Sequence, residues 1–255
     1  MTEPAPRKSD LGVRVVSAVV MVAVAGAALW LGGWWWPLFV LIVATACFFE
    51  FVRLIWLATP SFMIRSSGSI AALLYTGSAA ILLEGARHSV LHEDSAKIGS
   101  HLGVVAVLSI VGFVVATDVG AYFAGRTIGG PKIAPKISPS KTWAGLVGGM
   151  AAAGGWGILA LYLPTYIAGE KWWVAQPISA YFLPAFLSGA ILAIVAQAGD
   201  FFESWLKRKA GVKDSSNLIP GHGGVFDRAD GLIPVILVGG GSLSGWLIFG
   251  GLVQS

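Results

Sequence analysis

The chain has 255 residues, of which 56% are apolar and only 12% are charged, and its mean hydropathy is +0.77. A soluble domain usually carries about 25% charged residues, so this composition excludes an ordinary globular protein and indicates a multi-pass membrane protein. The 34 glycines agree with that class, because small residues let transmembrane helices approach closely. A single cysteine, Cys47, excludes an intramolecular disulfide.

Seven apolar segments come close to the roughly 20 residues that a membrane-spanning helix needs. In chain order they cover residues 15–31, 34–54, 68–84, 103–124, 143–163, 181–200 and 232–253. The first follows three basic residues, as a signal peptide would, but six more spans follow it, so we interpret it as a retained helix. The sequence predicts an all-α polytopic membrane protein with about seven transmembrane helices, or up to nine if the N-terminal spans are broken.

The basic residues predict the orientation of these helices. All but three of the 17 Lys and Arg residues lie in the N-terminal tail, or at the end of or after the second, fourth and sixth spans; the exceptions are Arg87, Lys97 and Lys171. Cytoplasmic segments of membrane proteins are enriched in Lys and Arg. We therefore predict a cytoplasmic N-terminus, with the charged segment 204–231 on the same side of the membrane.

Four carboxylates are predicted to meet at one depth. Asp118 lies inside the fourth span, Asp200 ends the sixth, and Asp227 and Asp230 stand just before the seventh. An ionised carboxylate in hydrocarbon is costly, so an acid inside a span is a functional-site hypothesis. If the sixth helix continues past the membrane edge, Ser204 and Lys207 share one face with Asp200.

Acids and bases at one membrane edge are typical of phosphate chemistry. Carboxylates hold a divalent cation such as Mg²⁺, while Lys and Arg neutralise the remaining phosphate charge. A transporter for an anion would use the bases but gain little from the acids. The glycines of the PGHGG segment, residues 220–224, have two interpretations: their N–H groups bind phosphate oxygens, or the segment is only a tight turn.

A second basic cluster lies in the segment 125–145, rich in Gly, Pro and Lys, which precedes the fifth span. Ser138 or Ser140 is predicted to be the N-cap of that helix, whose free N–H groups would attract an anion. Lys141 and Thr142 would then stand beside a bound phosphate. A capped helix start with solvated lysines is an equally open interpretation.

Two blocks of residues resemble the phosphatidate cytidylyltransferase family, also called CDP-diacylglycerol synthases. The longer block runs from Ser204-Trp205-Leu206-Lys207-Arg208 through Lys213-Asp214 and the PGHGG segment to Asp227-Arg228-Ala229-Asp230. The other comprises residues 118–126 and 137–142. With these blocks, residues 103–254 are expected to form a catalytic membrane core and residues 1–100 a set of variable N-terminal spans, within one integral membrane domain of residues 1–255.

The chain departs from this family at three points. Ser140 and Ala144 stand where the family often has Lys and Glu, which puts a role for a carboxylate there in doubt. The family is also credited with eight or nine spans. Either the N-terminal half is shorter here, or the second span, which contains Glu50 and Arg53, is broken into two pieces.

The resemblance implies a reaction in which CTP and phosphatidate give CDP-diacylglycerol and pyrophosphate, with Mg²⁺ and room for a second cation such as K⁺. It implies Asp200 and Asp227 as metal ligands. The catalytic set it implies is Asp200, Asp227, Lys207, Arg208, Lys213, Asp214, His222, Arg228 and Asp230. The substrate-binding set is Asp118, Ser138, Lys141, Thr142, Ser204, Gly223 and Gly224.

The expected partners are CTP, phosphatidic acid and the lipid bilayer, with no nucleic acid; the glycines of segments 145–157 and 239–250 leave room for a homodimer. The expected location is the bacterial inner membrane, with the active site on the cytoplasmic side. Two rival functions stay open, a CTP-dependent kinase acting on dolichol or diacylglycerol and an ion-coupled transporter. The long signature argues against the kinase, and the gathering of charge on one face argues against the transporter.

Overall fold

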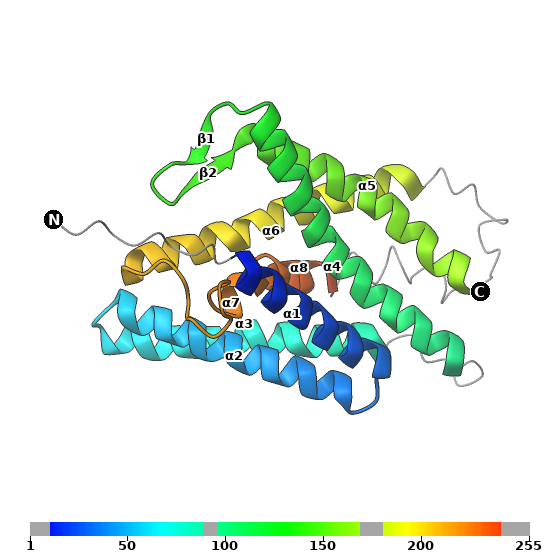
Figure 1. Ribbon diagram of the computed structural model, residues 1–255, viewed down its shortest axis with the longest axis horizontal. Coiled ribbons are helices and arrows are strands. Elements are labelled where there is room, and N and C mark those ends of the chain that lie inside the picture. Colours follow the sequence, from blue (N-terminus) through cyan, green and yellow to red (C-terminus); the bar gives the residue numbers. More distant parts are fainter. Residues whose placement is uncertain (1–10, 89–95, 169–180, 241–255) are drawn as a thin grey trace.

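The computed structural model describes residues 11–88, 96–168 and 181–240, and most of them are helical. A small antiparallel hairpin joins the fourth helix to the fifth (Figure 1). The helices are α1 (Leu11–Leu31), α2 (Trp35–Ala58), α3 (Phe62–His88), α4 (Ala96–Thr127), α5 (Trp143–Ala168), α6 (Phe182–Ala210), α7 (Phe226–Ala229) and α8 (Leu232–Val238), and the strands are β1 (Lys132–Ala134) and β2 (Ser138–Thr142).

Within the described residues, six helices, α1 to α6, are long and apolar enough to cross a membrane. They match the first six predicted spans, and α3, α4 and α6 run further than predicted because each continues into polar residues beyond its apolar run. The seventh predicted span, 232–253, is helical from Leu232 to Val238, and residues 241–253 lie outside the described residues. The alternative of a broken second span is wrong, since α2 passes unbroken through Glu50 and Arg53.

Glycines bring α4 and α5 into backbone contact. A Cβ atom on Gly120 would lie 2.5 Å from the Gly148 carbonyl oxygen, and one on Gly148 would lie 2.7 Å from the Gly120 carbonyl oxygen. A Cβ atom on Gly157 would overlap the Ala185 carbonyl of α6. Small residues at these crossings permit the close approach that helix association in a membrane uses. Of the glycines in the segment 145–157, all but Gly155 thus make close contacts within the chain.

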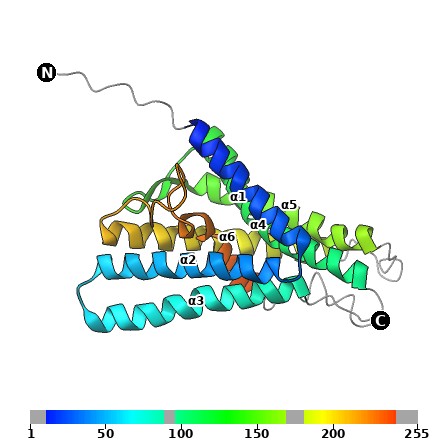
Figure 2. The same cartoon turned by 60° about the horizontal axis from the view of Figure 1, so that its bottom comes forward.

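The N-terminal helices are attached to α6 and α7 through an aromatic cluster. The Phe51 ring of α2 lies 5.0 Å from the Phe226 ring of α7, 5.7 Å from Phe202 of α6 and 5.9 Å from Tyr75 of α3, centroid to centroid. Figure 2 shows α2 and α3 as neighbouring antiparallel helices with α6 beside them. Helices α2 and α3 therefore share one apolar core with α6, α7 and α8.

The hairpin is the part of the fold that the all-α prediction missed. Lys132 of β1 pairs with Thr142 of β2, and Ala134 pairs with Ser138. Strands of three and five residues are too short to give a period-two pattern, and the prolines at 131, 135 and 139 favour a loop interpretation. The hairpin projects from the end of α4 and contacts α5 and α6 (Figure 1).

Candidate active site

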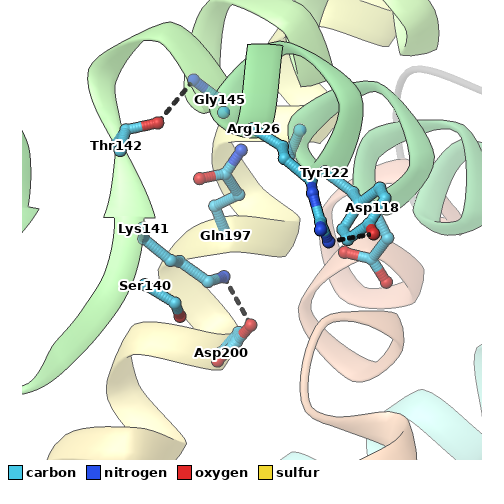
Figure 3. Close-up of a pocket in the computed structure, with 11 residues that line it drawn as sticks. Asp118, Tyr122, Arg126, Ser140, Lys141, Thr142, Gly145, Gln197 and Asp200 are labelled. Carbon is cyan, nitrogen blue, oxygen red and sulfur yellow. Dashed lines mark hydrogen bonds and ion pairs between the residues drawn. The ribbon is translucent and has the colours of Figure 1, made fainter. Parts of the chain in front are cut away.

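A cavity of about 340 Å³ opens between α4, the hairpin and α6, near the end of α6 that carries most of its charge. Several polar side chains point toward it (Figure 3). Its walls are Asp118, Ala121, Tyr122, Gly125, Arg126, Ser140, Lys141, Thr142, Gly145, Gln197 and Asp200. Three predicted substrate-binding residues, Asp118, Lys141 and Thr142, line this cavity together with Asp200.

Asp200 and Lys141 face each other across the cavity wall. Their carboxylate and ammonium groups form an ion pair, with side chains 32% and 20% exposed (Figure 3). The Ser204 hydroxyl also donates to Asp200 Oδ1 at 3.3 Å, which confirms that these two residues share one face of α6. Both ionic groups thus keep access to the cavity, where an incoming phosphate or cation can compete for them.

Thr142 caps the start of α5. Its Oγ1 accepts a hydrogen bond from the Gly145 N–H at 3.0 Å, the bond that an N-cap side chain makes. The prediction of Ser138 or Ser140 as the cap is wrong, because β2 continues through Thr142 and the helix begins at the next residue. Ser138 is buried in β2, and Ser140 lines the cavity.

Arg126 and Gln197 line the same cavity, and neither was among the predicted site residues. Arg126 Nη1 donates to the Tyr122 hydroxyl at 2.8 Å. The guanidinium is therefore held near the ring of Tyr122, the residue one helical turn earlier on α4. Gln197 is 5% exposed and lies between Thr142 and Asp200 (Figure 3). A signal for Gln197 existed in its spacing, since residue 197 lies one turn before Asp200 on α6.

A second, more deeply buried cluster lies where α6 meets α7. Lys207 Nζ is 2.6 Å from Asp227 Oδ1 and 2.5 Å from Glu203 Oε2. The side chains of Asp227 and Glu203 are only 4% and 1% exposed. The prediction that Lys207 points toward Asp227 is confirmed, whereas Glu203, one turn before Lys207, was not singled out from the sequence.

The other carboxylate oxygen of Asp227 accepts hydrogen bonds from the loop before α7. Oδ2 accepts hydrogen bonds from the Ser215 N–H, the Ser215 hydroxyl and the Gly224 N–H, all at 2.8 Å. Burial alone would raise the pKa of Asp227, but hydrogen bonding with Glu203, Lys207 and these backbone groups outweighs burial and lowers the pKa to about 2. Asp227 is therefore a carboxylate at every ordinary pH.

The PGHGG segment folds back on itself. Ile219 and Gly223 form an isolated antiparallel bridge, and Gly221 and Gly223 have φ values of +76° and +83°, which glycine adopts without strain. The Gly224 N–H is taken by Asp227. These contacts support the tight-turn interpretation for this segment.

The remaining predicted residues surround these two clusters. His222 Nδ1 lies 2.7 Å from the Ser17 hydroxyl of α1, Arg228 donates to the His222 carbonyl at 3.1 Å, and Arg208 Nε donates to the Ile137 carbonyl at 3.4 Å. Lys213 and Asp214 are exposed. The structure thus brings Asp200 to Lys141 and Asp227 to Lys207, whereas Lys213 and Asp214 lie at the surface.

Asp230 joins the two clusters. A Cβ atom on Gly199, the residue before Asp200, would overlap the Asp230 carbonyl, so the two backbones touch. Burial, and then the charge of Asp200, raise the pKa of Asp230 to about 7. The acids of α6 and of the α7 segment therefore interact electrostatically, as the sequence predicted.

Glu50 and Arg53 of α2 also contact the α7 segment, which the sequence did not predict. Glu50 accepts from the Ser215 and Ser216 hydroxyls at 2.8 and 2.6 Å, and Arg53 Nη1 donates to the Ser215 carbonyl. Arg53 is thus a helix residue with a partner, and not only one of the basic residues that set the orientation of the chain. Sequence offered one signal, a carboxylate inside an apolar span.

The donor set fits a cation that shares its ligands with substrate. Among the side chains of the described residues, no three acidic, histidine or cysteine groups converge to form a ready cage. Mg²⁺ in phosphate-handling sites is usually held by one or two carboxylates and completed by phosphates and water. Asp200 suits this role because it is partly exposed at the cavity. Asp227 is nearly buried, its Oδ2 is filled by three donors and its Oδ1 contacts the Lys207 ammonium, so a cation would have to displace Lys207 to bind there.

Comparison with known proteins identifies relatives over most of the chain. Residues 98–239 match the model of the cytidylyltransferase family. The chain is 34% identical to the phosphatidate cytidylyltransferase of Brucella suis biovar 1 (strain 1330) over 88% of its own length and 90% of that protein. It is 46% identical to the enzyme of the same name from Rickettsia felis over 46% of the chain and 48% of that protein. This chain therefore belongs to the cytidylyltransferase family.

Proposed function

We propose that this chain transfers CMP from CTP to phosphatidate, giving CDP-diacylglycerol and pyrophosphate in the synthesis of phospholipids. The observation that carries the proposal is the pairing of Asp200 with Lys141 on the wall of a polar cavity between apolar helices. The similarity to a phosphatidate cytidylyltransferase along 88% of the chain supports it.

The reaction needs no protein nucleophile. A phosphate oxygen of phosphatidate attacks the α-phosphorus of CTP, a new P–O bond forms, and the bond to the β-phosphate breaks with pyrophosphate taking its electrons. Catalysis then consists of positioning and charge neutralisation. Lys141, Lys207, Arg208, Lys213 and Arg228 neutralise phosphate oxygens in this proposal, and His222 donates a hydrogen bond to one of them.

Mg²⁺ held by Asp200 and Asp227 would neutralise triphosphate charge and help pyrophosphate to leave. A second cation such as K⁺ would have Asp118 and Asp230 as neighbours. Asp214, Ser138, Thr142, Ser204, Gly223 and Gly224 complete the proposed site by supporting its loops and substrates. A homodimer and a bacterial inner membrane location, with the active site facing the cytoplasm, belong to the same proposal; the cytoplasmic orientation of the site follows the distribution of basic residues.

A double-label assay tests the proposal. Purified protein receives Mg²⁺, phosphatidate, diacylglycerol and dolichol, together with CTP labelled separately on the cytidine and on the γ-phosphate. Transfer of CMP predicts cytidine label in the lipid phase and γ-label in pyrophosphate. Gamma-label in the lipid phase would instead mean a CTP-dependent lipid kinase, and unconsumed CTP would contradict both activities and favour a transporter.

A further inference from the structure

Glu50 lies on α2 and is only 6% exposed, and most other residues of this helix are apolar. A buried carboxylate is costly unless several donors satisfy it. Four donor groups lie within hydrogen-bond distance of Glu50, and all belong to the segment that precedes and begins α7. Oε1 accepts from the Ser216 hydroxyl at 2.6 Å and the Val225 N–H at 3.1 Å. Oε2 accepts from the Phe226 N–H at 2.7 Å and lies 2.8 Å from the Ser215 hydroxyl, whose one proton it shares with Asp227 Oδ2.

These contacts connect Glu50 to Asp227 through one residue. The Ser215 hydroxyl lies 2.8 Å from both Glu50 Oε2 and Asp227 Oδ2, and the Ser215 N–H donates to Asp227 as well. Ser215 has no exposed surface, and Arg53 of α2 holds its carbonyl oxygen. Arg53 therefore binds the carbonyl oxygen of Ser215, Asp227 binds its N–H, and its hydroxyl lies between Glu50 and Asp227.

The packing leaves this connection little freedom. A Cβ atom on Gly224 would overlap both the Ser215 hydroxyl and Glu50 Oε2. The Phe51 ring, next to Glu50 in the chain, stacks on the Phe226 ring at 5.0 Å and 15°. Glu50, Phe51 and Arg53 thus contact the residues that precede Asp227.

We infer that Glu50 is a positioning residue: it fixes the segment 215–226 so that the Asp227 carboxylate is held toward Lys207 and the α6 acids. The inference rests on the proposed function for its kinetic part. It assigns the N-terminal spans a task in the active site, because α2 supplies the acceptor that orders the catalytic segment.

Glu50→Gln is the sharpest test. Each Glu50 oxygen accepts one backbone N–H, so an amide NH₂ in either orientation would face the Val225 or the Phe226 N–H and leave a donor without its acceptor. A displacement of the reacting groups by about 1 Å costs about 100-fold in rate. We expect kcat to fall about 100-fold while KM for CTP changes less than about threefold, since Lys141 and the cavity are untouched.

Hydrogen–deuterium exchange of the amides provides the readout that does not depend on activity. In Glu50→Gln, peptides covering residues 213–227 should exchange at least about tenfold faster, and peptides from α4 and α5 should exchange as in the wild type. Glu84→Gln, the same change on α3 away from this segment, is the matched control and should alter neither kcat nor exchange. Ser216→Ala, which removes only the 2.6 Å bond to Oε1, should lower kcat about three- to tenfold.

The outcomes separate clearly. Wild-type kcat in Glu50→Gln, or a fall in kcat without faster exchange in 213–227, would overturn the inference. Faster exchange across the whole chain in both Glu50→Gln and Ser216→Ala would also overturn it, because Glu50 would then act on global folding alone. An inactive wild type would instead count against the proposed function, while the exchange comparison would still test whether Glu50 orders residues 213–227.

Discussion

Replacing Lys207 by Met should separate the stability of the buried cluster from its chemistry. The Lys207 ammonium lies between Glu203 and Asp227, at 2.5 and 2.6 Å, and the three side chains are at most 15% exposed. Met keeps most of the volume of Lys but removes the charge, which leaves the Asp227 carboxylate and the neighbouring Glu203 buried without a cation. Loss of one partner from a buried ion pair costs about 3–5 kcal/mol, because the remaining charge stays desolvated.

For a chain of this size each kcal/mol shifts the unfolding midpoint by about 2–4 °C, so Lys207→Met should lower it by roughly 6–20 °C. Tryptophan fluorescence on heating the detergent-solubilised protein measures the midpoint. Adding Glu203→Gln replaces one of the two buried acids by a neutral amide that can donate to Asp227, and should recover a large part of the loss, while CMP transfer is expected to be abolished in both variants. A midpoint within 2 °C of the wild type, or no recovery in the double variant, would refute the description of this cluster as two buried acids stabilised by the Lys207 charge.

Three further predictions use other contacts of the site. Gly224→Ala should lower kcat and the unfolding midpoint because its Cβ has no space, whereas Gly155→Ala, where nothing lies within 4 Å, should change neither in the same assays. Lys141→Met should raise KM for CTP at least about tenfold, the loss expected for a charge-assisted contact, and an unchanged KM would remove Lys141 from the substrate site. In EDTA, the unfolding midpoint should fall as pH rises from 3.8 toward 7, since the raised pKa of Asp230 lets the folded state hold a proton that the unfolded state releases; Asp230→Asn should flatten this part of the profile.

The sequence predicted the parts of the fold and site that depend on local pattern. Apolar length located six spans, and helical spacing placed Ser204 beside Asp200 on α6. It also aimed Lys207 toward Asp227, because a helix that continues past its apolar run must carry the charged residues on a definite face. These features need only helical geometry and the charge of nearby residues.

The features that the sequence did not predict depend on contacts between distant segments. Glu50 receives its donors from residues more than 160 positions away, so nothing near it indicates a partner. The hairpin is held by contacts with α5 and α6, and its short strands give no periodic signal. The cap of α5 moved from the predicted serines to Thr142 because β2 runs directly into the helix.

The most direct test of the central claim compares cytidine transfer by the wild type and by Asp227→Asn, each inserted in membranes and supplied with labelled CTP, phosphatidate and Mg²⁺. An Asn amide would place an NH₂ group against either the Lys207 ammonium or the N–H groups of Ser215 and Gly224, so it cannot replace the carboxylate. We predict lipid-soluble cytidine label with the wild type and none above background with the variant, at equal membrane insertion. Near-normal labelling by Asp227→Asn would contradict the account.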